Sequence, residues 1–553
     1  MNSSIDDDVL SDLVVKHFPF SEFNAGQKEA IEFAVRSVLS GTKHTIINAP
    51  TGIGKSALAI TVHRVLHELK GFNSVILTTT IGLQKQYNDD YSEELLDLKG
   101  KTNYPCLKNT PNGYGSVECL KELHNDKCEK FICPYVIARN SWVAHQGIKT
   151  TNSSFFIKAP DSLIPIDDSE KLDLCIIDEC HEIDKTIIRN TSLEFTPDSY
   201  KNLESVLKDF EQKWVMLMNL FKNCIPANSK FDFSVIRSDL DFIKSFLSEC
   251  EHVVTVFNEK IEYSKNSVSA STLMKYETVL NEAKDLLRIF KLIVYFCIKK
   301  SEFEFVMTND PLKNLITFIP ISSATPMTNI LVFNKAKQFI HMSATIGGVE
   351  QYTQNLGISE KDYSYFEIDN PIPRKNRPIF IDKMMQINMS TNPKDIAKLV
   401  DQIIKEELPN GNGVIHTVSF KLANDIAKNS KYSKYMTVSN NRAEILKLLQ
   451  MKNQIILSPS IETGYDFKGD LARWQIIAKV PFLNLGDIYV TERKKKSLKW
   501  YTREAVLRLI QASGRVVRGI NDYGNTYIID SNFLNLVQQN LELFPEWFLD
   551  SIE

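Results

Sequence analysis

Short apolar runs recur along both halves of the chain, and stretches with a helical pattern separate them. Residues 45–48 and 172–177 have the length and composition of buried strands, and apolar residues follow Lys55 at helical spacing. Residues 338–346 contain another strand-like run, and residues 455–482 predict a strand, a Gly-Tyr-Asp loop and a second strand. Buried strands that alternate with helices are typical of an α/β fold with parallel sheets.

Residues 190–337 follow a different pattern, because apolar residues there recur at intervals of three and four. This spacing predicts at least one long amphipathic helix. A stripe of this kind usually packs in a helical core, and it consists of Leu280, Ala283, Leu287, Phe290, Val294 and Cys297.

Composition narrows the class of protein. The 553 residues are enough for roughly four domains of about 150 residues each. A content of 43% hydrophobic and 24% charged residues is ordinary for a globular protein, and the net charge of −3 neither favours nor excludes nucleic acid. The acidic start is unlike a signal peptide, and no run of 18 apolar residues predicts a membrane span. Nine cysteines, an odd number, do not suggest a disulfide framework, so we expect a reducing cytosol.

A glycine-containing turn joins the first predicted strand to the first helix. Glycines let the backbone turn tightly and direct several N–H groups at one anion. A lysine then reaches the β- and γ-phosphates of ATP, and a serine hydroxyl ligates Mg²⁺. The sequence departs from the strict motif at its first position, where alanine replaces glycine. The predicted nucleotide-binding loop consists of Ala49, Pro50, Thr51, Gly52, Ile53, Gly54, Lys55 and Ser56.

Two carboxylates follow the strand predicted at 172–177. Asp178 and Glu179 begin the sequence Asp-Glu-Cys-His, and the carboxyl end of a parallel strand is where an open α/β sheet binds its ligand. Asp178 can complete the Mg²⁺ shell, and Glu179 can orient or deprotonate the attacking water. A strand followed by such residues is common by itself, but together with the phosphate loop it predicts an NTPase core.

Two stretches of the second half extend this core. The run at 338–346 contains Ser-Ala-Thr at 343–345, small hydroxyl residues able to couple two lobes. Gln511, Arg515 and Arg518 are spaced at 0, +4 and +7, which predicts one face of a helix and a set of donors suited to a triphosphate. An arginine that reaches from a second lobe would stabilise the transferring phosphoryl group and make lobe closure depend on ATP.

Eight stretches in a fixed order resemble the XPD/DinG branch of the superfamily 2 helicases, whose members carry an iron–sulfur cluster. They are GQKEAIEFA, APTGIGKS, TTTIGLQKQY, CPYVIARN, DECH, MSATI, ETGYDFKGD and QASGRVVR, between about Gly26 and Asp530. Any one is weak evidence, whereas eight in order are strong. The resemblance implies an α/β fold with two RecA-like motor lobes, each a parallel sheet flanked by helices. The implied order is lobe 1 (1–94), iron–sulfur cluster domain (95–165), lobe 1 (166–189), helical arch (190–330), lobe 1 (331–365) and lobe 2 (366–553).

The resemblance also implies roles for individual residues. Gln27 would contact the nucleobase, and Asp466 would lie at the nucleotide cleft between the lobes. Residues 78–80 and Gln84 would lie along the DNA, and residues 343–345 would couple the ATP state to the grip on DNA.

The sequence departs from the family's pattern at three further positions, none of which removes a residue that the chemistry needs. Asn48 stands where Glu is frequent, and His416 where Phe is usual. Cys180 replaces the usual Ala and puts a thiol beside the expected metal site, where oxidation could inactivate the enzyme.

Cys106, Cys119, Cys128 and Cys133 lie in a polar stretch with the spacing C-x12-C-x8-C-x4-C. Zinc sites and ferredoxins typically contain closer pairs, so the spacing alone leaves both kinds of metal site open, and thiolates suit either. The resemblance places the four in the cluster domain and implies that they hold one [4Fe–4S] cluster. The remaining cysteines are predicted to be small core residues or, for Cys180, a neighbour of the active site: Cys175, Cys180, Cys224, Cys250 and Cys297.

Residues 492–508 carry seven Lys or Arg against two Glu, with Trp500 and Tyr501 among them. Two interpretations are open. The stretch could contact single-stranded DNA, with cations on phosphates and rings under bases, or it could be a solvated loop with Trp500 packed inward.

The sequence therefore predicts an ATP-dependent DNA helicase that moves 5′→3′ on single-stranded DNA, a polarity taken from the resemblance. We expect single-stranded and forked duplex DNA as substrates, a monomer without membrane contact, and the cytoplasm of a prokaryotic or phage-infected cell. Two alternatives are an RNA–DNA hybrid-resolving or protein-displacing translocase, and a DNA-binding scaffold without turnover. The complete set of phosphate-loop, carboxylate and arginine residues argues against the scaffold.

Overall fold

The computed structural model describes most of the chain. The described residues are 5–105, 134–159, 163–165, 167, 171–196, 198–224, 228–264, 267–268, 270–298, 304–310, 312–324, 328–460, 467 and 469–553. The predicted cluster ligands Cys106, Cys119, Cys128 and Cys133 and the predicted cleft residue Asp466 lie outside these ranges.

Lobe 1 is built on a seven-stranded parallel sheet in the order β11-β1-β10-β5-β2-β4-β3. The central strands are buried on both sides, which explains why they occur in the sequence as apolar runs and not as alternating patterns. The strands predicted at 45–48 and 172–177 are confirmed. The seven strands are β1 (His44–Asn48), β2 (Ser74–Thr78), β3 (Leu95–Leu98), β4 (Ile148–Asn152), β5 (Leu172–Asp178), β10 (Ala336–Ser343) and β11 (Tyr363–Glu367).

Helices cover both faces of this sheet, and each face has its own apolar core. The helix predicted from Lys55 is confirmed as α3. One core is formed with α1 (Asp7–His17), α2 (Gln27–Leu39), α3 (Lys55–Lys70) and α4 (Ile81–Tyr91). The other is formed with α6 (Pro134–Ala144), α7 (Ser153–Lys158), α8 (Ile183–Thr191) and α13 (Val349–Leu356).

Strand membership bears on three of the predicted domain boundaries. β3 and β4 belong to the lobe 1 sheet, so both ends of the stretch 95–165 that was predicted as the cluster domain lie within lobe 1. β11 pairs with β1 and continues to Glu367, two residues beyond the predicted end of lobe 1 at 365.

The arch is a separate unit with its own large, phenylalanine-rich core. It was predicted as helical, but it also contains a four-stranded antiparallel sheet in the order β6-β9-β8-β7. The long helix predicted around residues 280–297 is confirmed as α11, which packs on α10. The elements are β6 (Leu193–Phe195), α9 (Phe210–Cys224), β7 (Ser229–Phe231), α10 (Leu240–Ser264), α11 (Ala270–Ile298), β8 (Phe305–Asp310) and β9 (Leu315–Pro320).

Lobe 2 repeats the architecture of lobe 1 on a six-stranded parallel sheet in the order β12-β17-β16-β13-β15-β14. Its strands are β12 (Ile379–Phe380), β13 (Gly413–His416), β14 (Met436–Val438), β15 (Ile455–Ser458), β16 (Trp474–Ile477) and β17 (Asn525–Ile528). Its helices are α14 (Pro393–Glu407), α15 (Phe420–Asn429), α16 (Arg442–Leu448), α17 (Ile488–Lys496), α18 (Leu498–Ser513), α19 (Asn532–Gln539) and α20 (Glu546–Leu549).

The basic stretch 492–508 differs from both interpretations of its sequence. It is not a loop, because α17 and α18 contain all of it except Ser497 between them. Trp500 is only 3% exposed and Tyr501 is also buried, so neither ring is available to stack under a base in this structure. The prediction that Trp500 packs inward is correct.

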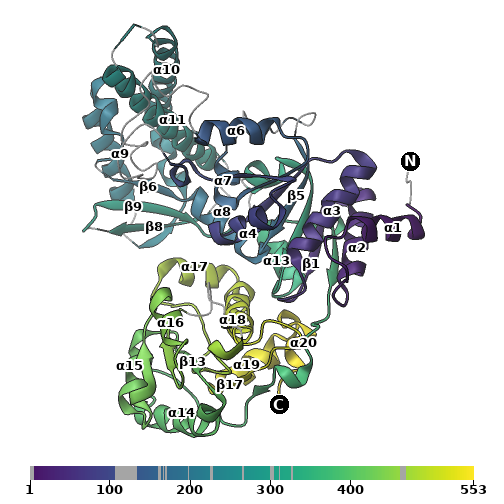
Figure 1. Ribbon diagram of the computed structural model, residues 1–553. Helices are drawn as coiled ribbons and strands as arrows, with labels where there is room; N and C mark the ends of the chain where they lie inside the picture. Colours follow the sequence, from purple (N-terminus) through teal and green to yellow (C-terminus); the bar gives the residue numbers. More distant parts are fainter. Residues whose placement is uncertain are drawn as a thin grey trace.

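Figure 1 shows how the parts are arranged. Lobe 2 lies below lobe 1, and α17 and α18 lie on its upper side, toward lobe 1 and the arch. The two motor lobes therefore meet along the helices that carry the basic stretch. Among the helices described, none is both long enough and apolar enough to cross a bilayer.

Buried histidines form a polar chain through the lobe 1 core. Nδ1 of His44 lies 3.1 Å from Nε2 of His341, whose Nδ1 lies 2.8 Å from the hydroxyl of Tyr352. Burial, reinforced by the neighbouring His341 and Lys43, lowers the pKa of His44 to about 2, and burial lowers the pKa of His341 to about 3. Both imidazoles are therefore neutral in the folded protein.

We expect these histidines to make lobe 1 sensitive to acid. In the unfolded chain they bind a proton near pH 6.5, so below that pH the unfolded state binds more protons than the folded state and stability falls as the pH falls. Each contributes a slope of up to about 1.4 kcal/mol per pH unit. Urea unfolding between pH 7 and pH 5 should show this loss, and His44→Asn should reduce it. His252→Asn, at an exposed site on α10 of the arch, is the control for replacing an imidazole outside lobe 1 and should keep the acid-induced loss.

Candidate nucleotide-binding site

The loop between β1 and α3 makes the tight turn expected of a phosphate-binding loop. Gly52 and Gly54 have φ angles of 88° and 81°, a left-handed conformation that glycine adopts without strain. A Cβ at Gly54 would lie 2.7 Å from the side-chain nitrogen of Gln27, and a Cβ at Gly52 would lie 3.1 Å from the carbonyl oxygen of Arg518. The loop is thus packed against other parts of the chain, and α3 starts directly after it at Lys55 with N–H groups suited to an anion.

Two amide side chains brace this loop. Nε2 of Gln27 donates to the carbonyl oxygen of Gly54 at 3.1 Å, and its Oε1 accepts from the backbone N–H of Asn24 at 3.0 Å. Nδ2 of Asn24 in turn donates to the carbonyl oxygen of Ile53 at 3.2 Å. Gln27 is buried and bonded to the loop itself, so its contact with a nucleobase stays a prediction. Nothing in the sequence marked Asn24, since one Asn ahead of a helix is unremarkable.

The two acidic residues at the end of β5 lie beside the loop. Asp178 is 2% exposed, and its two carboxylate oxygens accept from the hydroxyl of Tyr87 and the backbone N–H of Glu179, both at 2.9 Å. Glu179 has left-handed backbone angles (φ 52°, ψ 48°), a strained conformation typical of functional sites. Nζ of Lys55 lies 3.8 Å from the Glu179 carboxylate.

The two carboxylates differ in their protonation. Burial, together with the charge of Glu179, raises the pKa of Asp178 to about 6. Burial also acts to raise the pKa of Glu179, but the charges of Lys55 and Arg515 and the hydrogen bond from Ser343 outweigh it and lower that pKa below its usual value. Glu179 is thus held ionised as a proton acceptor.

Oxygen donors at the end of β5 and at the start of α3 fit Mg²⁺. Asp178 is a buried carboxylate that a cation would stabilise, and the hydroxyl of Ser56 is a second hard oxygen donor. Mg²⁺ is usually held by one or two carboxylates together with phosphates and waters. Within the described residues no group of three or more His, Cys, Asp or Glu side chains is gathered where it could hold a metal.

His181 connects lobe 1 to lobe 2. Burial lowers its pKa, so the imidazole is neutral. The amide nitrogen of Gln511 donates to its Nε2 at 2.6 Å, and its Nδ1–H donates to Oγ of Ser343 at 2.7 Å. Oγ of Ser343 also lies 3.0 Å from the carbonyl oxygen of Thr345 and 3.4 Å from the Glu179 carboxylate. A continuous hydrogen-bonded chain therefore runs from Glu179 to α18 of lobe 2.

The arginines reach the cleft, but not from a helix. The prediction that Gln511, Arg515 and Arg518 share one helix face is wrong, because α18 ends at Ser513 and Gly514 caps it. The three still line one cavity of about 790 Å³ between the lobes, together with Thr51, Glu179 and His181. The residues after α18 thus bring both arginines to the same cavity as Gln511, although they are not in the helix.

Further residues line this cavity that the sequence did not reveal. Asn370 and Arg377 come from the segment that connects the lobes, and Arg508 comes from α18. Only Arg508 had a usable signal, since it lies three residues before Gln511 and therefore on the same side of α18.

Of the residues expected along the DNA, some lie at the surface of the cavity and others are buried. Thr79 and Thr80 border the cavity, and the hydroxyl of Thr80 caps α4. Gln84 is instead buried, and its amide nitrogen donates to the carboxylate of Asp97 and, at 3.0 Å, to the carbonyl oxygen of Leu98. Gln84 is therefore a structural residue of lobe 1.

Two family models match the chain. The model of a helicase C-terminal domain matches residues 407–551, and the model of the res subunit of type III restriction enzymes matches residues 20–220. A probable ATP-dependent helicase of Methanocaldococcus jannaschii is 21% identical, over 95% of this chain and 94% of the relative. A protein named 3′–5′ exonuclease DinG from Staphylococcus aureus is also 21% identical, over 97% of this chain and 69% of the relative.

Solved structures show the same fold over nearly the whole chain. An XPD helicase superposes with a TM-score of 0.59 at 14% identity and covers 95% of this chain and 98% of its own. Xpd4 of S. tokodaii superposes with a TM-score of 0.56 at 13% identity and covers 96% of this chain and 99% of its own. The chain is an XPD/DinG-like superfamily 2 helicase.

In this XPD/DinG-like helicase, the unusual Cys180 is shielded from solvent. It is buried, and burial raises the pKa of its thiol to about 12. Thiol oxidation proceeds through the thiolate, which is almost absent at such a pKa. Burial and the raised pKa therefore favour resistance to oxidation over the sensitivity suggested by the sequence. Cys175, Cys250 and Cys297 are buried as predicted.

We expect Cys180 to resist alkylation in the folded protein. Iodoacetamide at pH 8 should leave its peptide unmodified before denaturation and alkylate it fully afterwards, as read by mass spectrometry. Cys180→Ala should have the same sensitivity to peroxide as the unchanged protein. Rapid labelling of Cys180 in the native state would show that the site opens.

Proposed function

We propose that the chain hydrolyses ATP between its two lobes and uses the energy to move 5′→3′ along single-stranded DNA and to unwind duplex DNA. The hydrogen-bonded chain from Glu179 through Ser343 and His181 to Gln511 carries this proposal, because it ties the nucleotide-binding end of lobe 1 to lobe 2. The relatives named as an ATP-dependent helicase and as DinG support it. The direction of movement rests on the resemblance to the XPD/DinG branch.

The lobe 1 residues would bind and activate the triphosphate. The loop from Ala49 to Ser56 would bind the phosphates, with Lys55 on the β- and γ-phosphates. Ser56 and Asp178 would hold Mg²⁺, which neutralises charge on the phosphates. Glu179 would accept the proton of the attacking water as the water oxygen bonds to the γ-phosphorus and ADP leaves.

The lobe 2 residues would contact the triphosphate from the opposite side of the cleft and complete the nucleotide-binding site. Arg515 and Arg518 would stabilise the negative charge of the transferring phosphoryl group, and this favours the closed arrangement of the lobes while the triphosphate is present. When the lobes close, Gln511 would bind His181, which in turn is hydrogen-bonded to Ser343 of lobe 1. Asp466 would complete the cleft.

The inserted parts would handle the DNA. The arch would close over the single strand. Thr79 and Thr80 would lie along it, whereas Thr78 is buried at the end of β2. Cys106, Cys119, Cys128 and Cys133 would hold the [4Fe–4S] cluster that shapes a rigid wedge, and soft thiolates in a polar segment suit this group. A monomeric state and a cytoplasmic location in a prokaryotic or phage-infected cell stay predictions.

An RNA–DNA hybrid or R-loop is the second candidate substrate, and displacement of bound protein a second candidate activity. No residue in the sequence is marked as reading a 2′-OH. Strand displacement assays on DNA forks with 5′ or 3′ tails, on hybrids and on R-loops separate these possibilities and also test the direction.

We expect Lys55→Ala to abolish the motor. Loss of the ammonium at the phosphates should lower DNA-stimulated ATP hydrolysis about 100-fold or more and eliminate unwinding of a 5′-tailed fork. Lys70→Ala, an exposed site at the other end of α3, is the matched control and should behave like the unchanged protein. Substantial turnover by the Lys55 variant would place ATP hydrolysis elsewhere.

We expect the four cysteines to bind iron and to matter more for unwinding than for ATP hydrolysis. Protein purified without oxygen should be brown and contain about four iron per chain. Cys106→Ser and Cys119→Ser should lose iron and unwinding while keeping most DNA-stimulated ATPase activity. Cys250→Ala, in the arch core, should keep its iron. Colourless protein that contains zinc, or robust unwinding without metal, contradicts the cluster assignment or the wedge.

A further inference from the structure

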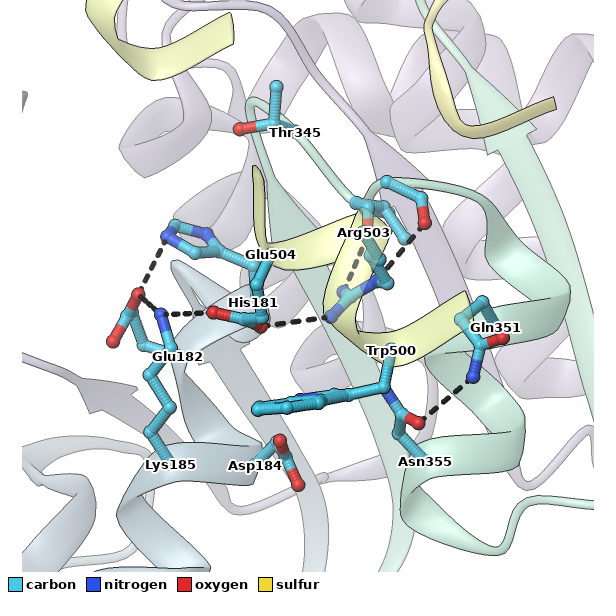
Figure 2. A network of polar contacts seen from close by, with 12 residues as sticks. His181, Glu182, Asp184, Lys185, Thr345, Gln351, Asn355, Trp500, Arg503 and Glu504 are labelled. Carbon is cyan, nitrogen blue, oxygen red and sulfur yellow. Dashed lines mark hydrogen bonds and ion pairs between the residues drawn. The ribbon is translucent and has the colours of Figure 1, made fainter. Parts of the chain in front are cut away.

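One arginine of lobe 2 is fully inserted into lobe 1. Arg503 of α18 is 1% exposed, and its guanidinium donates to the carbonyl oxygens of Ile346, at 3.0 Å and 2.5 Å, and of Gly347, at 3.1 Å. These carbonyls follow directly after residues 343–345. A Cβ at Gly347 would lie 3.1 Å from Cγ of Arg503, so the segment and the arginine are closely packed. Figure 2 shows the guanidinium at the centre of this contact.

The charge of Arg503 belongs to a chain of alternating charges. Glu504, 2% exposed, lies 3.8 Å from the Arg503 guanidinium and 3.2 Å from Nζ of Lys185. Lys185 donates to Glu182 at 2.7 Å, and Glu182 lies 3.4 Å from Nε2 of His181 (Figure 2). The chain therefore starts at the segment after β10, passes through α18 and returns to the histidine at the end of β5.

The same helix ends at the nucleotide cleft. Gln511 follows Arg503 by eight residues, roughly 12 Å along α18 at 1.5 Å per residue. A helix of this length moves as one rigid piece. A shift of the start of α18 relative to Ile346 therefore changes the position of Gln511 relative to His181.

We propose that Arg503 is a positioning residue for ATP hydrolysis: by holding α18 on the carbonyls of Ile346 and Gly347, it places Gln511 on His181 when the lobes close. The proposal rests on the proposed ATPase function and extends it to a residue that does not touch the nucleotide cavity. Glu504 and Lys185 assist, because they keep the start of α18 at a fixed distance from α8.

A second anchor separates this role from simple docking of the lobes. Arg493 of α17 pairs with Asp184 of α8 at 2.8 Å, both fully buried, and its guanidinium lies 4.3 Å from the centre of the Trp500 ring. This pair does not involve the segment after β10. We therefore expect lobe 2 to stay attached to lobe 1 when Arg503 is replaced. The replacement should disturb the position of α18 relative to lobe 1, and with it the contact of Gln511 with His181.

The test compares Arg503→Met and Arg503→Lys with Lys499→Met. Lys499 lies one turn earlier on α18, is exposed, and pairs within lobe 2 with Glu542 at 3.8 Å, which makes it a matched control. We expect Arg503→Met to lower kcat of DNA-stimulated ATP hydrolysis about tenfold, with KM for ATP within about twofold of the unchanged protein. Arg503→Lys should recover part of kcat, since an ammonium can donate to one of the two carbonyls.

The outcomes are distinct. If the unchanged protein and Lys499→Met hydrolyse no ATP, the proposed function fails. If they hydrolyse ATP and Arg503→Met has the same kcat, or loses activity only through a raised KM, the positioning role is overturned. If Arg503→Met does not fold, Arg503→Lys decides: a lowered kcat at unchanged KM supports the role, and unchanged kcat removes it.

Discussion

The contact between the two lobes depends on how α18 packs against the segments that follow two neighbouring strands, β5 and β10. These strands pair directly, so the acidic pair after β5 and the Ser-Ala-Thr segment after β10 are adjacent before lobe 2 arrives. β1 pairs with β10 on the other side, and the backbone N–H of Ala49 donates to the carbonyl oxygen of Ser343 at 2.8 Å. The phosphate loop, the Ser-Ala-Thr segment and the acidic pair thus form one continuous edge. α18 contacts the residues that follow two of these parts, Ile346 and Gly347 after the Ser-Ala-Thr segment and His181 after the acidic pair.

The buried charges contribute more to selecting one alignment of α18 on lobe 1 than to the binding energy between the lobes. Taking Arg503 and Glu504 out of water costs several kcal/mol per ion, and this cost is recovered only when each finds its partners in good geometry. A displaced helix would leave the guanidinium without its carbonyls and Glu504 without Lys185. An apolar interface of the same size would tolerate sliding, whereas the charged one penalises it. The interface therefore favours one alignment of the lobes, the one that brings Gln511 to His181.

The sequence patterns predicted those parts of the structure that are determined by residues close together in the chain. The phosphate loop, the central strands and α11 were found because glycines, apolar runs and helical spacing are local signals. The helix containing Arg515 and Arg518 was predicted too long, because the periodicity continues through Gly514 while the backbone does not. Gln27, Asn24 and Arg503 act on parts of the chain far from them in sequence, so nothing in their own neighbourhood revealed their contacts. The cluster domain boundaries failed for the same reason, since only pairing shows that β3 and β4 belong to lobe 1.

The helix before α18, α17, connects lobe 2 to both lobe 1 and the arch. On α17, Arg493 pairs with Asp184 of lobe 1, and three residues later Lys496 pairs with Glu304 at the base of the arch sheet at 3.1 Å. Asp184 also accepts from Ser323, which follows β9 of the arch, so the same carboxylate binds lobe 2 and the second connection of the arch. The arch has its own core, and these contacts are at its base. A change in the lobe 2 position at the nucleotide cleft therefore cannot leave the arch unaffected, because one short helix touches lobe 1 and the arch together.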